Sequence, residues 1–183
     1  MKKLFITLIV SLLFVAGVNS QSIANYAFST NKPVALEDMS AGTTQLIPGS
    51  SFQVASGLTD IGFTFNFMGG TYSQFSVNSN GQLQLGALIS ATGISEAAPS
   101  TALIVPMSGS NSILNTGKVH YIVQGTAPYR VLVVEWKDLN IPTPILDNNP
   151  PIPEYNPTTI QVLIRKVLRN MHLVQVSRLP SKI

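Results

Sequence analysis

An alternation of apolar with polar or small residues between Ile61 and Gly86 limits the folds open to this chain more than any other feature. Ile61–Phe67 has an apolar side chain at every second position, which is typical of a strand with one buried face. A second alternation follows at Phe75–Val77, and Leu83–Leu85 resumes it. Asn80-Gly81 tolerates positive φ and predicts a two-residue type I′ hairpin turn between them. The stretch therefore predicts three strands and an all-β fold.

Further strand patterns occur along the rest of the chain, separated by turn residues. Thr43–Val54 predicts two short strands divided at Pro48-Gly49. Val119–Asp138 predicts a second hairpin that turns at Gly125–Arg130, with a central return strand because Val131–Trp136 is apolar on both faces. Other strands are predicted at residues 26–28, 101–107 (buried on both faces, or at a sheet edge because of Pro106) and 158–164, and the six prolines of residues 141–157 predict a long surface loop. The fold class that we expect is an antiparallel β-sandwich of the jelly-roll or immunoglobulin-like type.

Composition and charge exclude several classes of function. Charged residues make up 10% of the chain and apolar residues 45%, which argues against a disordered protein. All eight acidic residues but only four of the eleven basic residues lie between positions 21 and 160, so the body of the chain is mildly acidic. It lacks the basic surface that nucleic-acid binding requires, and we expect no nucleic-acid partner. The absence of cysteine excludes disulfides, thiolate metal sites and a cysteine nucleophile.

The first twenty residues have the features of a secretory signal peptide. Lys2-Lys3 is followed by the almost wholly apolar Leu4–Val18, and the small residue Ser20 suits signal peptidase. Cleavage there would leave Gln21 at the N-terminus and no transmembrane span. The alternative is an uncleaved membrane anchor, although the apolar run is shorter than the ~20 residues that a membrane span requires. We therefore expect a secreted or cell-surface protein.

Several motifs together resemble the N-terminal β-sandwich module of large secreted surface proteins from Bacteroidota. The first is the strand Gly62–Gly69, of the form GFxFxFxG, followed by Tyr72, Val77 and Asn80-Gly81. The second is the turn Gly125–Arg130 that leads into Val131–Trp136, and the opening Tyr26–Ser29 also fits. The chain is similar in a looser way to nidogen-type modules of adhesive extracellular proteins. The resemblance implies a β-sandwich exported by type IX secretion, commonly followed by further modules.

The C-terminal end departs from this pattern. Residues 165–183 hold five basic residues and no acidic one, whereas the resembling modules continue with a Leu-Tyr-Glu-like motif and another strand. We therefore divide the chain into a signal peptide (1–20), a β-sandwich module (21–164) and a basic tail (165–183) that a frameshift or a truncation has produced. The alternative is a genuine tail, because Val167, Leu168, Met171 and Val174 keep a helical spacing and the basic side would contact an anionic surface.

No constellation of residues predicts catalysis, and we expect no catalytic site and no cofactor. Only two histidines are present, and we expect His120 to be a solvent-facing or hydrogen-bonded strand residue. For Glu135 and Asp138 we expect a cross-strand or surface salt pair. We also expect no metal centre, although Asp147, Asn148 and Asn149 could offer oxygen ligands to calcium.

Aromatic residues are the candidates for ligand binding. Exposed aromatics on loops are a common means by which β-sandwiches hold sugars or proteins. Tyr129 lies in the predicted turn and Tyr155 in the proline-rich loop, and Trp136 is a further candidate. The sequence thus predicts a non-catalytic extracellular module for adhesion, binding or spacing, with surface carbohydrate or protein as its partner. The alternative is an accessory domain of a secreted hydrolase or peptidase whose catalytic part lies outside this chain.

Overall fold

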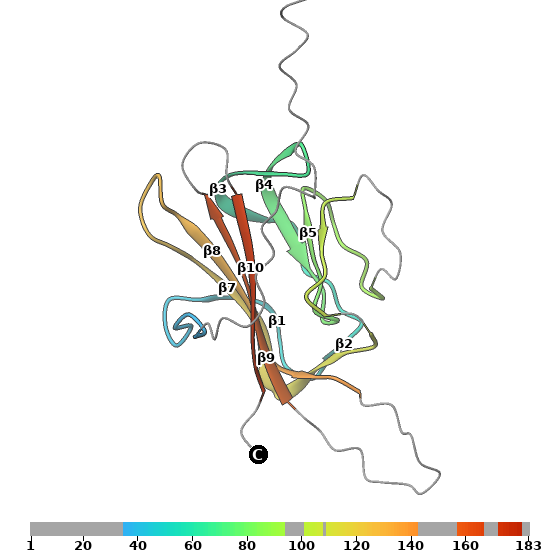
Figure 1. The fold of residues 1–183 in the computed structure, drawn as a ribbon. Helices are drawn as coiled ribbons and strands as arrows, with labels where there is room; N and C mark the ends of the chain where they lie inside the picture. Colours follow the sequence, from blue (N-terminus) through green and yellow to red (C-terminus); the bar gives the residue numbers. More distant parts are fainter. Residues whose placement is uncertain (1–34, 94–100, 108, 143–156, 167–171, 181–183) are drawn as a thin grey trace, which may run out of the picture. The chain divides into compact units, whose positions relative to one another are not determined.

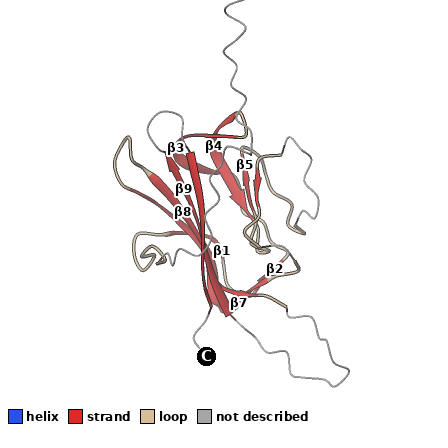
Figure 2. Ribbon diagram, viewed as in Figure 1, coloured by secondary structure: helices blue, strands red, loops and turns tan. Residues whose placement is uncertain are grey.

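The computed structural model describes residues 35–93, 101–107, 109–142, 157–166 and 172–180. The chain divides into two units, Met1–Thr30 and Asn31–Ile183, and all the described residues belong to the second. They form ten strands joined by turns and loops (Figures 1 and 2), and none of them lies in a helix that could cross a membrane. The predicted signal peptide, the opening strand at 26–28 and most of the proline-rich segment fall outside the described residues.

The larger sheet has the strand order β1-β7-β8-β9-β10, and β2 also pairs with β7. All its neighbouring strands run antiparallel. β8 is central in this order, as its apolar residues on both faces predicted. The strands are β1 (Thr44–Ile47), β2 (Ser51–Phe52), β7 (Ser112–Gln124), β8 (Val131–Asn140), β9 (Pro157–Lys166) and β10 (His172–Pro180).

The smaller sheet has the order β3-β4-β5-β6 and contains the stretch with the strongest alternation. Residue 61 and every second residue after it as far as Phe65 are buried, while the intervening residues are exposed, so the period-2 prediction is confirmed. The predicted strand at 101–107 contains only the two-residue β6, which lies at the edge of the sheet and ends before Pro106. The strands are β3 (Thr59–Phe67), β4 (Gly70–Val77), β5 (Leu83–Leu85) and β6 (Leu103–Ile104).

The two sheets bury one common apolar core, which confirms the all-β, sandwich-like fold. Phe75 of the small sheet meets Tyr121 of the large sheet edge to face, with ring centroids 5.5 Å apart. On β8 the core takes alternate residues, Leu132, Val134 and Trp136. Burial of each such large apolar side chain contributes about 1.5–3 kcal/mol, which explains how a chain without disulfides can hold two sheets together.

The type I′ turn is at a different place from the one predicted. Met68 and Gly69 join β3 to β4, with φ of 49° and 78°, and positive φ at both central residues is the type I′ signature. At Asn80-Gly81 only Gly81 has positive φ. There the Asn78 amide donates to the Gln82 carbonyl at 3.1 Å, which closes a three-residue loop. The prediction of a two-residue turn at Asn80-Gly81 is therefore wrong, although a hairpin does turn there.

The basic C-terminal stretch extends the large sheet. β9 runs past Ile164 to Lys166, and β10 pairs with it along its whole length, from His172↔Lys166 to Pro180↔Thr158. The helical alternative for this stretch is wrong over residues 172–180, which are a strand. Val174 packs against the core from β10. The origin of the stretch in a frameshift or truncation stays a prediction.

Candidate functional site

The turn between β7 and β8 presents the most exposed tyrosine of the described residues. Tyr129 is 61% exposed. Its backbone amide donates to the Thr126 carbonyl at 2.8 Å, which closes the turn. Gly125 has φ of 77°, and a Cβ there would lie 2.8 Å from the Tyr129 carbonyl oxygen, so this close approach requires glycine. The tyrosine side chain is therefore presented on a turn with a defined backbone.

Arg130 connects this turn of the large sheet to β3 of the small sheet. Its guanidinium donates a hydrogen bond to the Gly62 carbonyl of β3 and lies 5.8 Å from the centre of the Phe63 ring. A cation over an aromatic ring at this distance is attracted by the electron-rich ring face. The two contacts join the β7–β8 turn to β3, so Tyr129 stands on a turn that both sheets support.

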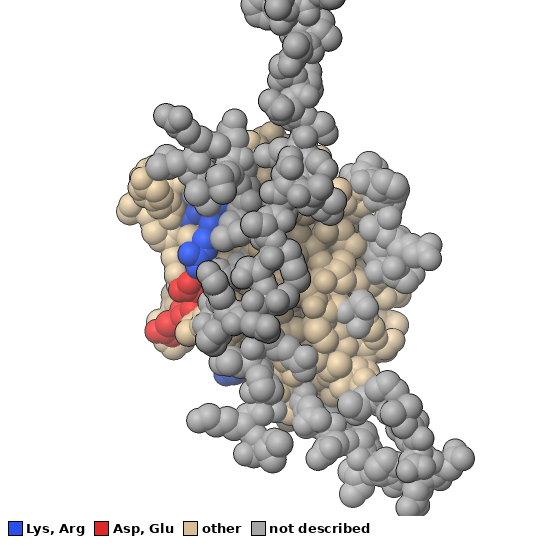
Figure 3. All heavy atoms as spheres, in the orientation of Figure 1, with Lys and Arg blue, Asp and Glu red and all other residues tan. Residues whose placement is uncertain are grey.

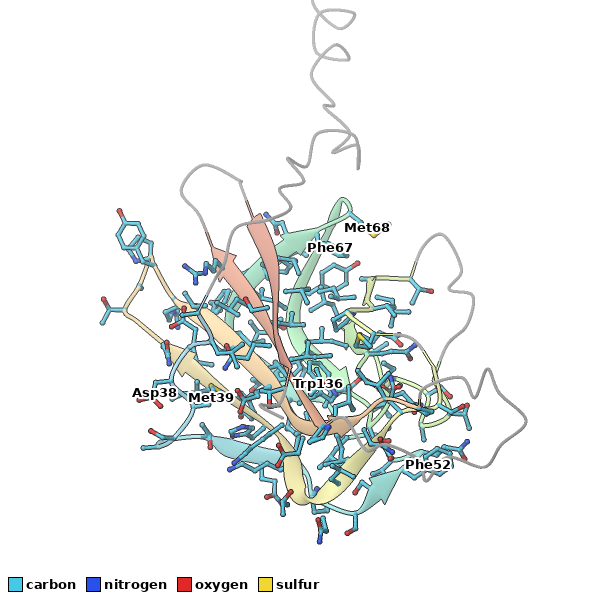
Figure 4. All side chains as sticks on the ribbon, turned by 60° about the horizontal axis from the view of Figure 1, so that its bottom comes forward. Asp38, Met39, Phe52, Phe67, Met68 and Trp136 are labelled. Atoms are coloured by element: carbon cyan, nitrogen blue, oxygen red, sulfur yellow. The ribbon has the colours of Figure 1, made fainter. Side chains whose placement is uncertain are left out.

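Trp136 is buried in the core instead of lying on a ligand-binding surface. Its exposed fraction is 0%, and its indole N–H donates to the Asn78 carbonyl at 2.7 Å. Figure 4 shows Trp136 in the middle of the fold, with Phe67 and Met68 at the β3–β4 tip and Phe52 well apart from them. The ring is thus used for packing and for holding the loop that begins at Asn78, and it is inaccessible to a ligand.

Four of the predicted site residues lie outside the described residues. They are Tyr155, the second loop tyrosine, and the oxygen-ligand candidates Asp147, Asn148 and Asn149. Among the residues that the structure does describe, no three His, Cys, Asp or Glu side chains come together as metal ligands.

A row of buried polar residues crosses the outer face of the large sheet, which is the face that points away from the common core. Sequence reasoning did not predict it. His120, Glu135, Gln161 and Ser177 are direct partners on β7, β8, β9 and β10. His120 Nε2 lies 2.7 Å from Glu135 Oε1, and Gln161 Nε2 donates to Glu135 Oε2, also at 2.7 Å. All four side chains are buried. We call these four residues the polar row.

The polar row forms hydrogen bonds with a segment that precedes β1. The Gln161 side chain bonds to the backbone of Glu37, whose carboxylate pairs with Arg165 at 3.0 Å. In Figure 3 a group of described basic side chains lies next to a group of acidic side chains, and a further basic side chain appears apart from them. The expected cross-strand pair is therefore present, but it joins Glu135 to His120, while Asp138 accepts a hydrogen bond from the Thr116 hydroxyl at 3.0 Å.

Comparison with known proteins assigns the chain to a family. The family model described as NIDO related matches residues 25–150, which cover most of the described sandwich. Neither the curated proteins nor the solved structures contain a match to this sequence. The match supports an extracellular module and agrees with the loose resemblance to nidogen-type modules. Because the matched residues make up more than half of its length, the chain belongs to the NIDO-related family.

Proposed function

We propose that the chain is a non-catalytic binding or adhesion module of a secreted or cell-surface protein, and that Tyr129 contacts its ligand. The observation that carries this proposal is the 61% exposure of an aromatic residue on a turn that Arg130 connects to the opposite sheet. A rigid tyrosine offers a large contact area at little cost in conformational entropy. Surface carbohydrate or an extracellular protein is the partner that such a ring suits.

The motif set further supports a place among Bacteroidota surface proteins that use type IX secretion. The strand Gly62–Gly69 and the turn Gly125–Arg130 carry this part of the proposal. Fractionation of the native host tests it: the chain should appear outside the cell, and export should stop when the type IX machinery is deleted. Retention in the cytoplasm of the wild-type host would contradict it.

The binding role is tested by screening the purified chain against a glycan array and a panel of immobilised extracellular proteins. For any ligand found, Tyr129→Ala should lower the affinity about three- to tenfold, since aromatic contacts contribute about 0.5–1.5 kcal/mol. Leu88→Ala is the matched control, because Leu88 is equally exposed, at 63%, and lies on the loop after β5. Equal affinities of the Tyr129→Ala and wild-type chains for every ligand would overturn the proposed role of this ring.

A further inference from the structure

Residues 35–39 lie on the outer face of the large sheet without joining it as a strand. They contact the sheet through Glu37 and Met39, while Asp38 between them is exposed. Figure 4 shows Asp38 and Met39 well away from the buried Trp136. We call residues 35–39 the bound segment.

Gln161 binds the backbone of this segment. Its Oε1 accepts a hydrogen bond from the Glu37 amide at 2.8 Å, and its Nε2 donates to the Glu37 carbonyl at 2.9 Å. One side-chain amide thus satisfies both backbone groups of one residue, as a neighbouring strand would. Such main-chain bonds hold an extended peptide whatever its side chains are. The other partner of Gln161 is Glu135, which His120 holds in turn, so the polar row orients the amide.

Two further contacts recognise side chains of the segment. Arg165 Nη2 donates to Glu37 Oε1 at 3.0 Å. Met39 packs into an apolar cluster with Val133 and Leu163, against which Ile122 and Val131 also pack. Residues 37 and 39 alternate, as the side chains of an extended peptide on a surface do. The face therefore recognises three features: a backbone, a carboxylate, and an apolar side chain two residues further on.

The bound segment leaves two buried polar atoms of this face without hydrogen-bond partners among the described residues. Within the described part of the chain, the buried Arg165 Nε and His120 Nδ1 have no hydrogen-bond partner. Arg165 therefore holds the Glu37 carboxylate through Nη2 alone, although a guanidinium can bind a carboxylate through two parallel bonds. Unpartnered buried polar atoms are uncommon in native proteins, and each calls for a physical explanation. An incomplete fit between this face and residues 35–39 provides such an explanation.

We propose that the outer face of β8 and β9 around Gln161 and Arg165 is a peptide-binding site that the chain's own residues 35–39 occupy as an intramolecular ligand. Its external ligand is an extended peptide with a carboxylate and, two residues later, an apolar side chain. The bound segment is replaceable because it has no strand pairing and because its ion pair is about one third exposed on each side. The site uses other side chains than Tyr129, so it is independent of the proposed binding turn.

A binding assay with a synthetic peptide tests this proposal directly. The probe is a labelled peptide with the sequence of residues 35–41, added to the purified full chain and followed by fluorescence anisotropy. The chain's own segment competes at an effective concentration on the order of millimolar, so wild-type protein should bind the probe weakly. Glu37→Gln combined with Met39→Ser weakens that competitor. The probe should therefore bind this double variant at least about tenfold more tightly than wild type.

Matched variants show whether the binding uses the proposed contacts. Arg165→Ala in the double variant should lower the affinity for the probe about tenfold, and a probe with Gln in place of its Glu should lose a similar factor. Leu88→Ala in the same background should change nothing, because Leu88 lies on the small-sheet side after β5. A folded double variant that binds no probe, or Arg165→Ala binding as tightly as its parent, overturns the proposal.

Hydrogen exchange of the unmodified chain gives an independent answer that needs no variant. The Glu37 amide is protected by the Gln161 side chain, and it should exchange through local opening, faster than the β8 and β9 amides. Addition of the unlabelled peptide should speed this exchange further, because the peptide occupies the site from which the segment is released. Exchange of the Glu37 amide at the rate of the β8 core, unaffected by the peptide, would overturn the proposal.

Discussion

His120 on β7 and Glu135 on β8 face each other directly, with His120 Nε2 2.7 Å from Glu135 Oε1 and both side chains buried. The second carboxylate oxygen accepts a hydrogen bond from Gln161 Nε2, so each oxygen of Glu135 has a partner on a neighbouring strand. The carboxylate thus links three strands on the face opposite the main core. We therefore expect the positions of the polar side chains on this outer face to depend on Glu135.

Replacement of Glu135 tests this dependence. Glu135→Ala removes the acceptor of two buried donors and should lower the free energy of unfolding by about 2–4 kcal/mol. Glu135→Gln should cost less, since its amide keeps the volume and one acceptor oxygen. Denaturation with urea measures both, with Asp60→Ala as control because the Asp60 carboxylate is exposed and accepts a hydrogen bond from the exposed Gln74 amide. A loss from Glu135→Ala no larger than that of the control would contradict a structural role for the pair.

Trp136 supports a second prediction, about the loop that follows β4. Trp136→Phe removes the indole N–H from the Asn78 carbonyl and leaves a small cavity, and it should lower the free energy of unfolding by about 2 kcal/mol. The Asn78 carbonyl retains a long hydrogen bond from the Gly81 amide, at 3.4 Å, which limits the loss. Thermal unfolding checks this, and Tyr129→Phe should be nearly neutral. An unchanged midpoint for Trp136→Phe would show that the indole bond contributes little.

Local patterns predicted the strands well because each pattern lies within one strand. The alternation at Ile61–Phe67 has the period of the pleat, and Val131–Trp136 has apolar residues on both faces because β8 is covered on both sides. The alternation Leu132, Val134 and Trp136 also contained the evidence that Trp136 faces the core. Trp136 lies within β8, so the side of the sheet that it faces follows from this alternation and not from its residue type.

The polar row could not be predicted, because only the register between strands brings its members together. His120 and Glu135 are 15 positions apart, and Glu135 and Gln161 are 26 apart. A shift of one residue in any strand pairing would turn the side chain to the other face of the sheet. The type of each turn could not be predicted either. Asn80-Gly81 is the residue pair that type I′ turns prefer, whereas Met68-Gly69 has the backbone dihedral angles of such a turn.

The bound segment allows a prediction about pH. Hydrogen bonds from the side chain and the backbone amide of Ser40 hold the pKa of the exposed Asp38 carboxyl below its ordinary value of 3.8. A carboxyl whose pKa is lower in the folded state stabilises that state above the unfolded pKa, and the contribution is lost as pH falls through the folded pKa. Ser40→Ala should therefore raise the pKa of Asp38 toward 3.8. Carboxyl titration by NMR of the wild-type and Ser40→Ala chains measures it, and an unmoved Asp38 pKa would contradict the assigned cause.

Met68 occupies a turn position that its side chain does not favour. It has φ of 49°, in the left-handed region that asparagine and glycine adopt more readily, and its side chain is 46% exposed. Asn-Gly is the preferred pair for a type I′ turn, so Met68→Asn should raise the free energy of unfolding by about 0.5–1 kcal/mol. Met68→Ala shortens the side chain without relieving the backbone and should give no gain. Urea denaturation compares the three chains. Equal stabilities of Met68→Asn and wild type would mean that contacts of the methionine at the β3–β4 tip offset its unfavourable backbone conformation.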